Sequence, residues 1–228
     1  MASTGSTLNP ADYDAWYDSE RGRWIGETEY RLLMRLLAPR HAERALDVGC
    51  GTGWFTRRLA GDSSLQITGV DLDESSLAFA SGKDAFSGYV QADALALPFA
   101  DETFDCVVSV AALCFIKGWP GAFREIIRVT RRRFVVGLLN KSSLLWREKG
   151  AHGGTGAYQG AYWHTEHEIR CALASLPVDR IELRSAVFFP GGARVARLME
   201  HLIPNVFLHG AFLVVAGDKK TGKTELYA

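Results

Sequence analysis

The amino-acid sequence predicts an α/β fold in which helices cover both faces of a largely parallel sheet. Between residues 45 and 139, short apolar runs typical of buried strands alternate with helical patterns. This order is typical of β-α units, which form parallel sheets. A glycine-rich turn follows the first apolar run, and acidic residues follow the next two. We therefore expect polar groups at the ends of the strands to form the functional site.

The segment before the first strand is predicted to be helical. Residues 1–10 form a polar, disordered tail without the basic segment and apolar core of a signal peptide. Residues 11–40 show an apolar helical stripe that follows an aromatic cluster. The stripe consists of Leu32, Leu33, Leu36 and Leu37, and the cluster of Tyr13, Trp16, Tyr17 and Trp24.

The first strand, Ala45–Val48, is predicted to turn into a helix through a loop with glycines at positions 49, 51 and 53. Glycine permits positive φ angles and lets a ligand approach the main chain. Dinucleotide sites usually have the spacing G-x-G-x-x-G, whereas this loop reads G-x-G-x-G and Asp47 precedes it. We expect a nucleotide-like ligand, and the carboxylate suits an ammonium better than a phosphate. An ordinary tight turn is the alternative.

An acid followed by G-x-G-x-G resembles the motif at the end of strand 1 in class I S-adenosylmethionine-dependent methyltransferases. The resemblance implies that Gly49, Cys50 and Gly51 line the methionine end of the cofactor, and that Asp47 holds its ammonium directly or through water. It also implies a Rossmann-like sheet of seven strands, mostly parallel, with an antiparallel last strand. In this family the N-terminal helices form a lid, so Tyr17 or Trp24 would cover the ligand. Alternatively, these aromatic residues pin the helices to the sheet.

The second strand, Leu65–Val70, is followed by Asp71, Leu72 and Asp73. A carboxylate about twenty residues beyond the glycines can accept from both hydroxyls of a ribose, and Asp71 has this position. Leu72 would form an apolar surface against the adenine. Asp73 is predicted to cap the next helix.

The third acid, Asp93, follows the strand that begins near Tyr89. This stretch resembles the type-11 methyltransferases, a group that includes enzymes of ubiquinone and menaquinone biosynthesis. The resemblance implies that Asp93 accepts from the adenine amino group and that the Ala94 N–H meets the ring. Phe104–Val110 is predicted to be the fourth strand, and Val110 would offer its carbonyl to the methionine ammonium. By itself, an Asp in a loop is more often a turn former.

A helix is predicted over Trp119–Thr130 and a fifth strand over Phe134–Leu139. Four arginines gather at the end of that helix, and they form either a phosphate patch or, as we favour, a cluster of cations that complements the helix C-terminus. These residues are Arg128, Arg131, Arg132 and Arg133.

Residues 150–163 are rich in glycine and are predicted to form a mobile lid. Under this hypothesis, four side chains in or next to the segment could reach a substrate: His152, Tyr158, Tyr162 and His164. A structural role for them is the favoured alternative. Thr165 and Glu168 form a capping box, which predicts a helix start with His167 in solvent. The last two strands are predicted over Val178–Phe189 and Ala211–Gly217, with a helix over Ala193–Leu202 between them.

Residues 217–224 match the pattern G-x-x-x-x-G-K-[ST] of nucleoside-triphosphate sites. Such a site needs a helix after the motif, and only four residues follow it. We therefore interpret residues 218–228 as a flexible tail.

Composition limits the classes of function. The chain has 228 residues and 47% hydrophobic content, which suffices for a single domain over residues 1–228. Lys plus Arg and Asp plus Glu number 26 each, so no net field attracts nucleic acid, and no apolar run is long enough for membrane insertion. The cysteines have no C-x-x-C spacing, which disfavours a metal site and disulfides. We expect a cytoplasmic protein, as a monomer or a homodimer.

Together these features predict an S-adenosylmethionine-dependent methyltransferase with a small-molecule acceptor and S-adenosylhomocysteine as the product. No catalytic side chain is identified, and a base is required only if the acceptor must lose a proton. Residues 109–115 lack an amide-methylating N-P-P-Y motif, which disfavours nucleic-acid and protein amide acceptors. The alternatives are a non-catalytic module that binds S-adenosylmethionine and an NAD-dependent oxidoreductase, which the glycine spacing and Asp93 disfavour.

Overall fold

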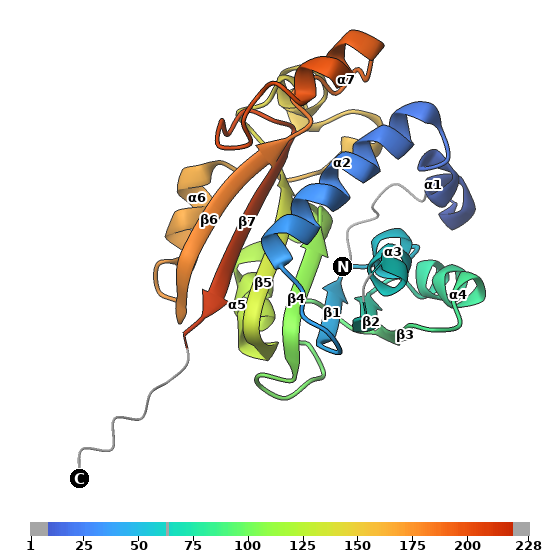
Figure 1. Ribbon diagram of the computed structural model, residues 1–228, viewed down its shortest axis with the longest axis vertical. Helices are drawn as coiled ribbons and strands as arrows, with labels where there is room; N and C mark the ends of the chain where they lie inside the picture. Colours follow the sequence, from blue (N-terminus) through green and yellow to red (C-terminus); the bar gives the residue numbers. More distant parts are fainter. Residues whose placement is uncertain (1–8, 63, 221–228) are drawn as a thin grey trace.

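The computed structural model describes residues 9–62 and 64–220, and most of both expected tails lies outside the described residues. Seven strands form one sheet in the order β3-β2-β1-β4-β5-β7-β6 (Figure 1). Neighbouring strands from β3 to β5 pair in parallel, whereas β7 is antiparallel to both β5 and β6. The predicted fold class is thus confirmed. The strands are β1 (Arg44–Val48), β2 (Gln66–Asp71), β3 (Gly88–Gln91), β4 (Phe104–Val110), β5 (Thr130–Leu139), β6 (Val178–Ala186) and β7 (Phe212–Lys219).

Helices cover both faces of the sheet, with α2 on one face and α5 on the other (Figure 1). None of the helices in the described part of the chain has the length and apolar character needed to span a membrane. The α-helices are α1 (Pro10–Trp16), α2 (Glu20–Leu37), α3 (Trp54–Asp62), α4 (Glu74–Lys83), α5 (Trp119–Val129), α6 (Glu166–Leu173) and α7 (Arg194–Glu200). Shorter helical turns are η1 (Ala112–Phe115), η2 (Trp146–Gly150), η3 (Ala151–Gly153) and η4 (Gly156–Tyr158).

Local capping decides where the helices begin. Asp73 accepts from the backbone N–H groups of Ser75 and Ser76, so it caps α4 as predicted. Thr165 and Glu168 form the predicted capping box at the start of α6. The predicted N-terminal helical segment is divided into α1 and α2, because the Ser19 side chain accepts from the Gly22 N–H and starts a new helix.

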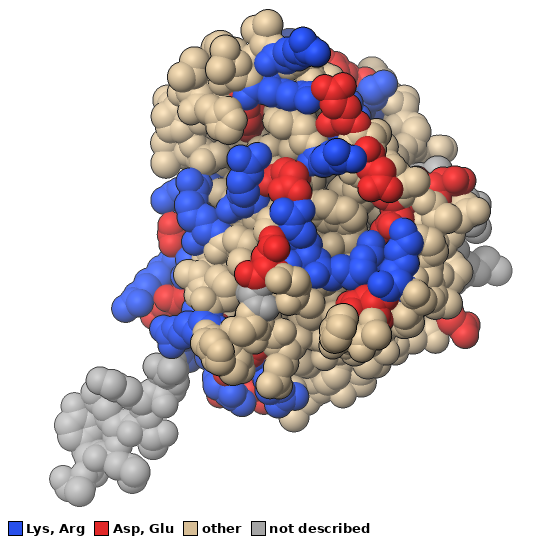
Figure 2. Space-filling model, turned by 45° about the vertical axis from the view of Figure 1, so that its right-hand side comes forward, with Lys and Arg blue, Asp and Glu red and all other residues tan. Residues whose placement is uncertain are grey.

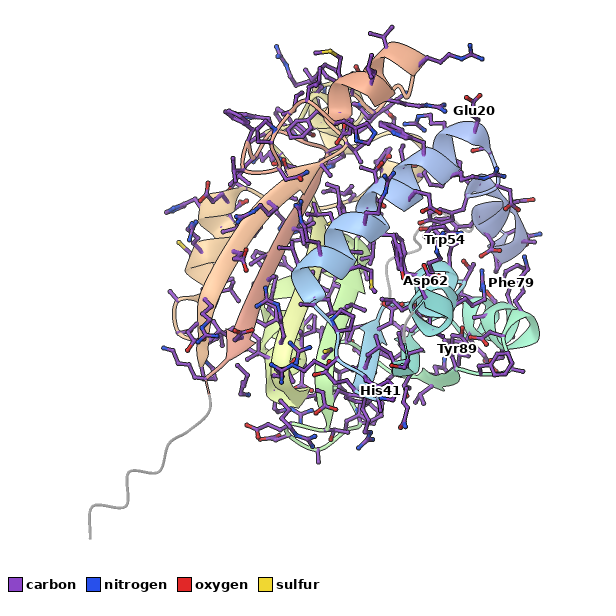
Figure 3. All side chains as sticks on the ribbon, viewed as in Figure 1. Glu20, His41, Trp54, Asp62, Phe79 and Tyr89 are labelled. Carbon is purple, nitrogen blue, oxygen red and sulfur yellow. The ribbon has the colours of Figure 1, made fainter. Side chains whose placement is uncertain are left out.

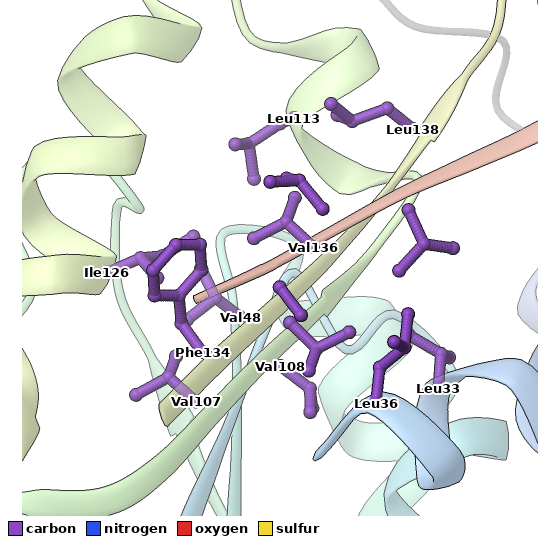
Figure 4. Packing of buried hydrophobic residues seen from close by; sticks show 14 of the residues in the cluster. Leu33, Leu36, Val48, Val107, Val108, Leu113, Ile126, Phe134, Val136 and Leu138 are labelled. Atoms are coloured by element: carbon purple, nitrogen blue, oxygen red, sulfur yellow. The ribbon is translucent and has the colours of Figure 1, made fainter. Parts of the chain in front are cut away.

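The core lies on both faces of the central strands. Phe134 of β5 pairs in register with Val107 of β4, and both lie on the side of α5, where Ile126 contributes to the same cluster (Figure 4). Leu33 and Leu36 of α2 pack on the opposite face (Figure 4). Burial of these side chains on each side holds the carboxyl ends of β1 and β4 at a fixed edge of the sheet.

The arginines that follow α5 correct one expectation. β5 begins at Thr130, so three of the four arginines lie in a strand and not at the end of a helix. Each pairs with a carboxylate: Arg128 with Glu125 and Asp101, Arg131 with Asp105, Arg132 with Glu43, and Arg133 with Glu182 and Asp218. Basic and acidic side chains are likewise interspersed on the face in Figure 2. The cluster is therefore a set of ion pairs, and of the four arginines only Arg128 lies in the last turn of α5, where the favoured interpretation placed them.

The end of β7 corrects the boundary expected for the C-terminal tail. Gly217 lies in this strand opposite Phe134, where a Cβ atom would be 2.8 Å from the Phe134 ring. Asp218 and Lys219 also belong to β7, and Asp218 pairs with Arg133. The first glycine of the apparent triphosphate motif is thus a strand residue, and residues 221–224 of that motif lie outside the described residues.

Candidate functional site

The glycine-rich loop is fastened to the end of the neighbouring strand β2. The N–H groups of Gly49 and Cys50 donate to the Val70 carbonyl at 2.7 and 2.9 Å. The Gly51 N–H donates to Asp71 Oδ2 at 2.7 Å. Because three successive N–H groups point toward β2, the loop turns sharply, and Gly49, Gly51 and Gly53 have φ angles of 74°, 53° and 76°.

The three glycines differ in what surrounds them. A Cβ atom at Gly49 would lie 2.1 Å from the Ala112 Cβ, and one at Gly53 would lie 2.7 Å from the Tyr89 hydroxyl. At Gly51 nothing lies within 4 Å of that position. Gly49 and Gly53 are therefore required by packing inside the protein, whereas the backbone at Gly51 borders open space that a ligand can occupy.

Asp47 lies under this loop, with 1% of its surface exposed. Its Oδ2 accepts from the Thr56 hydroxyl at 2.6 Å, and no cationic side chain of the described residues forms an ion pair with it. Burial, and to a lesser degree repulsion from Asp71, raises the pKa of Asp47 to about 7. A cation placed beside this carboxyl would favour its ionised form.

Asp71 joins the loop to the turn after β2. Besides the bond from Gly51, its Oδ1 accepts from the Asp73 N–H at 3.0 Å. Each carboxylate oxygen retains a further acceptor position. The next residue, Leu72, is 63% exposed, and its carbonyl accepts from the Gln91 side chain at 3.0 Å. A large exposed apolar side chain beside an acid is the arrangement expected for contact with a base and its ribose.

The other expected ligand contacts follow β3 and β4. Asp93 is exposed, and its Oδ1 accepts from the Leu95 N–H at 2.9 Å, which is a turn-forming contact. Ala94 and Val110 are half-buried. After Val110 the chain turns through Ala111, which has a φ of 57°. Because β3, β2, β1 and β4 are neighbours and parallel, the expected strand-end residues share one edge of the sheet.

Tyr17 lies beside this edge, in contact with α3. It is 7% exposed and stacks on Trp54 with ring centroids 4.4 Å apart and an interplanar angle of 15°. The Trp54 side chain projects from α3 toward α1 and α2 (Figure 3). Trp24, in contrast, lies near Arg197 of α7, with the guanidinium carbon 5.9 Å from the ring centroid. Tyr17 thus joins the end of α1 to the helix that follows the glycine loop, and its role as a cover over a ligand stays a prediction.

Sequence reasoning missed two acidic residues of the N-terminal helices. Asp14 of α1 is buried and pairs with Arg57 of α3 at 2.7 Å and Lys83 of α4 at 2.9 Å. These bonds lower the pKa of its carboxyl despite burial. Glu29 of α2 is half-buried, and burial raises its pKa to about 8. The helical pattern places both on helices but carries no signal of their surroundings.

The glycine-rich segment is more firmly anchored than predicted. Trp163 is 9% exposed and belongs to the hydrophobic core, and the Tyr162 N–H donates to the Cys114 carbonyl at 2.6 Å. His164 is 2% exposed and lies edge-on to Trp119 at 4.7 Å. Burial lowers the pKa of His164 to about 4, so this residue is a neutral core histidine. Tyr158 remains half-buried, and His152 is exposed.

Comparisons with known proteins agree with this geometry. A family model described as a methyltransferase domain matches residues 46–135, which contain the loop and all three strand-end acids. A malonyl-[acyl-carrier protein] O-methyltransferase of Erwinia pyrifoliae is 36% identical over 125 residues, which cover 52% of this chain and 47% of that protein. An uncharacterized protein of Mycobacterium tuberculosis is 32% identical over 198 residues, which cover 84% of this chain and 66% of that protein.

Among solved structures, a methyltransferase from Thermotoga maritima, described as S-adenosylmethionine-dependent and as a possible histamine N-methyltransferase, superposes with a TM-score of 0.75. The alignment covers 92% of this chain and 96% of that one at 23% identity, and shows a shared fold. The chain spans 47% and 66% of the lengths of the two curated relatives above, so their full activities do not transfer to it directly.

Proposed function

We propose, on the premise that this chain belongs to the class I S-adenosylmethionine-dependent methyltransferase family, that it transfers the methyl group of S-adenosylmethionine to a small-molecule acceptor. The observation that carries the proposal is the open space at Gly51, whose backbone is held by Asp71 at 2.7 Å. A ligand there can contact the main chain and the Asp71 carboxylate together. This combination suits a nucleoside joined to an amino acid.

The residues around this space fit the parts of the cofactor. Asp71 would accept from the ribose hydroxyls, Leu72 would cover the adenine, and Asp93 with the Ala94 N–H would meet its polar edge. The loop from Gly49 through Cys50 to Gly51 would line the methionine end. Asp47 and the Val110 carbonyl would hold the ammonium, and Tyr17 would support the site from α1. The lack of a cationic partner for Asp47 among the described residues supports this assignment, because an ammonium beside its buried carboxyl would stabilise the ionised form and offset the effect of burial on its pKa.

The chemistry follows from positioning. When bound, S-adenosylmethionine supplies a methyl group made electrophilic by its sulfonium. The protein must then align the acceptor atom behind that carbon and exclude water, and such alignment contributes roughly 7–11 kcal/mol to catalysis. The stacking contact between Tyr17 and Trp54 keeps the end of α1 close to α3, the helix that follows the loop.

Transfer of a labelled methyl group into a small-molecule extract tests the proposed function. S-adenosylmethionine labelled in the methyl group is incubated with the protein and a protein-free metabolite extract, and labelled products are separated by chromatography. The expected result is a labelled small molecule whose formation falls at least tenfold with Asp71→Asn and is kept with Asp73→Ala, which removes only a helix cap. Absence of any labelled product, with S-adenosylhomocysteine still bound, would instead support the non-catalytic alternative.

A further inference from the structure

Asp14 of α1 joins this helix to α3 and α4, which lie beside it (Figure 1). Its Oδ1 accepts from the Arg57 guanidinium of α3 at 2.7 Å, and its Oδ2 accepts from the Lys83 ammonium of α4 at 2.9 Å. Only 5% of the Asp14 surface is exposed. Although burial alone would raise the pKa of the Asp14 carboxyl, the bonds from Lys83 and Arg57 lower it, so the carboxyl stays ionised.

The Arg57 guanidinium also reaches the glycine-rich loop. Its Nη1–H donates to the Thr52 carbonyl at 2.5 Å, while its Nη2–H donates to Asp14. Thr52 is 2% exposed and lies between Gly51 and Gly53. A guanidinium suits this position, because its N–H groups are fixed in one plane and can serve two acceptors at once. One side chain thus connects a carboxylate of α1 to a main-chain carbonyl of the loop.

The contact from Arg57 adds to the contacts that the loop makes with β2. Gly51 donates its N–H to Asp71 at 2.7 Å. The next residue, Thr52, offers its carbonyl to Arg57. The backbone at Gly51 is the part of the loop that borders open space. The position of this backbone therefore depends on both supports, and loss of either would let it move.

Lys83 extends the same connection to the turn that follows β2. It lies in the last turn of α4, and this helix begins directly after Asp73, which caps it. The preceding residues, Asp71 and Leu72, are the proposed contacts of the ribose and the adenine. Because α4 is a single helix of 10 residues, a fixed end relative to α1 limits how far its start can shift.

We propose that Asp14 is a positioning residue for cofactor binding: its carboxylate orients Arg57, and Arg57 in turn holds the glycine-rich loop in the conformation that receives S-adenosylmethionine. This inference rests on the proposed function, because it assigns a further residue to the same site. Asp14 acts without touching the cofactor. The alternative is that the ion pairs only fasten α1 to the protein, in which case their loss would lower stability and leave binding unchanged.

Calorimetry of S-adenosylhomocysteine binding to the full chain with Asp14→Asn tests the inference. Asparagine has nearly the size of aspartate but carries no charge, so Arg57 loses its counter-charge and turns toward solvent. We expect the affinity to fall about tenfold or more, as for the loss of a hydrogen bond to a charged group. Unfolding by denaturant should show a folded variant of lower stability. A folded variant with the affinity of the natural chain would overturn the inference, because Asp14 would then serve only stability.

Glu27→Gln is the matched control. Glu27 of α2 forms the same kind of ion pair with Arg58, the neighbour of Arg57 in α3. Within the described part of the chain, however, the Arg58 side chain makes no hydrogen bond to the glycine-rich loop. This variant should lose stability as Asp14→Asn does and keep the affinity of the natural chain for S-adenosylhomocysteine. An equal loss of affinity in both variants would overturn the inference, because any loosened contact with α3 would then weaken binding.

A double-mutant cycle tests whether Asp14 acts through Arg57. Arg57→Gln removes the charge that contacts Thr52, and it should weaken binding at least as much as Asp14→Asn. The double variant should bind no more weakly than Arg57→Gln alone, since the carboxylate has nothing left to orient. Additive losses would show two independent effects and overturn the route through Arg57. A natural chain that fails to bind S-adenosylhomocysteine would refute the proposed function, and with it the role of Asp14 in binding.

Discussion

At the end of β2, the Asp71 carboxylate receives two backbone N–H groups and still has room for further donors. Hydrogen bonds to a charged acceptor contribute about 1.5–3 kcal/mol each. Asp71→Asn should therefore weaken S-adenosylhomocysteine binding at least tenfold, as measured by calorimetry.

Asp73→Ala is the matched control, because Asp73 lies two residues later and only caps α4. It should cost about 0.5–2 kcal/mol of folding stability and leave the affinity unchanged. Equal affinities for Asp71→Asn and the natural chain, both folded by circular dichroism, would remove Asp71 from the site.

We predict that the Asp47 carboxyl releases a proton when the cofactor binds. Burial raises the pKa of its carboxyl in the folded protein to about 7, so it is largely neutral at pH 6. An ammonium beside it favours the ionised form, so binding at pH 6 should release close to one proton, and binding at pH 9 almost none. Calorimetry in buffers of different ionisation enthalpy measures this number. Asp47→Asn should abolish the release; a release that persists in this variant would assign it to another group.

The raised pKa of Asp47 also makes the stability of the folded protein depend on pH. Because the folded pKa lies above the value of about 3.9 expected for an unfolded Asp, the stabilising contribution of neutral Asp47 is present at acidic pH and is lost as the pH rises through 7.

Among the individual residues, the sequence predicted best where a local rule applies. Asp73 and the pair Thr165–Glu168 cap helices as expected, since these capping contacts join residues only two or three positions apart. Asp14 was missed because its partners Arg57 and Lys83 come from other elements, and a helical pattern shows which face is apolar but not what lies opposite a charged side chain.

At the scale of the loop, we predict that alanine in place of Gly49 and alanine in place of Gly51 have different effects on stability and binding. Gly49→Ala places a Cβ atom 2.1 Å from the Ala112 Cβ and should destabilise the fold. Gly51→Ala meets no atom within 4 Å, so only the strain of its positive φ, about 1–2 kcal/mol, lowers stability. Its methyl group, however, enters the proposed cofactor space. Thermal unfolding and calorimetry should show a folded Gly51→Ala protein with at least tenfold weaker S-adenosylhomocysteine binding. Unchanged affinity would mean that no ligand approaches this backbone.

The glycine-rich segment remains a predicted lid. Trp163 and the Tyr162 N–H anchor its end, so the mobile part should lie before residue 161. Hydrogen exchange at residues 150–160 is expected to be fast in the free protein and several-fold slower with S-adenosylhomocysteine and a true acceptor bound, because Tyr158 then has a ligand to cover. Equal protection in both states would contradict a lid.

The bounds of β4 and β5 show which strand ends a local sequence pattern can predict and which it cannot. β4 was predicted to the residue, because an apolar run bounded by polar turns defines a buried strand. β5 begins four residues earlier than expected, at Thr130. Three consecutive arginines do not resemble a strand, but Glu43, Asp105 and Asp218 from other elements neutralise them.

At the scale of the whole molecule, the sheet order brings the candidate site together. The chain runs outward from β1 to β3 and then returns to β4 on the other side of β1. Ligands bind at such a reversal, at the carboxyl ends of the strands. The resemblance of the motifs to a known family predicted a mostly parallel sheet of seven strands with an antiparallel last strand. The ion pairs of Asp14 with Arg57 and Lys83 were not predictable in this way, because they depend on how α1, α3 and α4 pack together.

The most direct test of the proposed cofactor is the thermal unfolding of the full chain with S-adenosylhomocysteine or with NADH. A ligand at about 100 times its Kd stabilises the folded state by about 2.7 kcal/mol, which corresponds to roughly 5–11 °C in Tm for a chain of this size. We expect S-adenosylhomocysteine to raise Tm in this range with a dependence on its concentration, and NADH to leave Tm unchanged. A rise with NADH and none with S-adenosylhomocysteine would contradict the account.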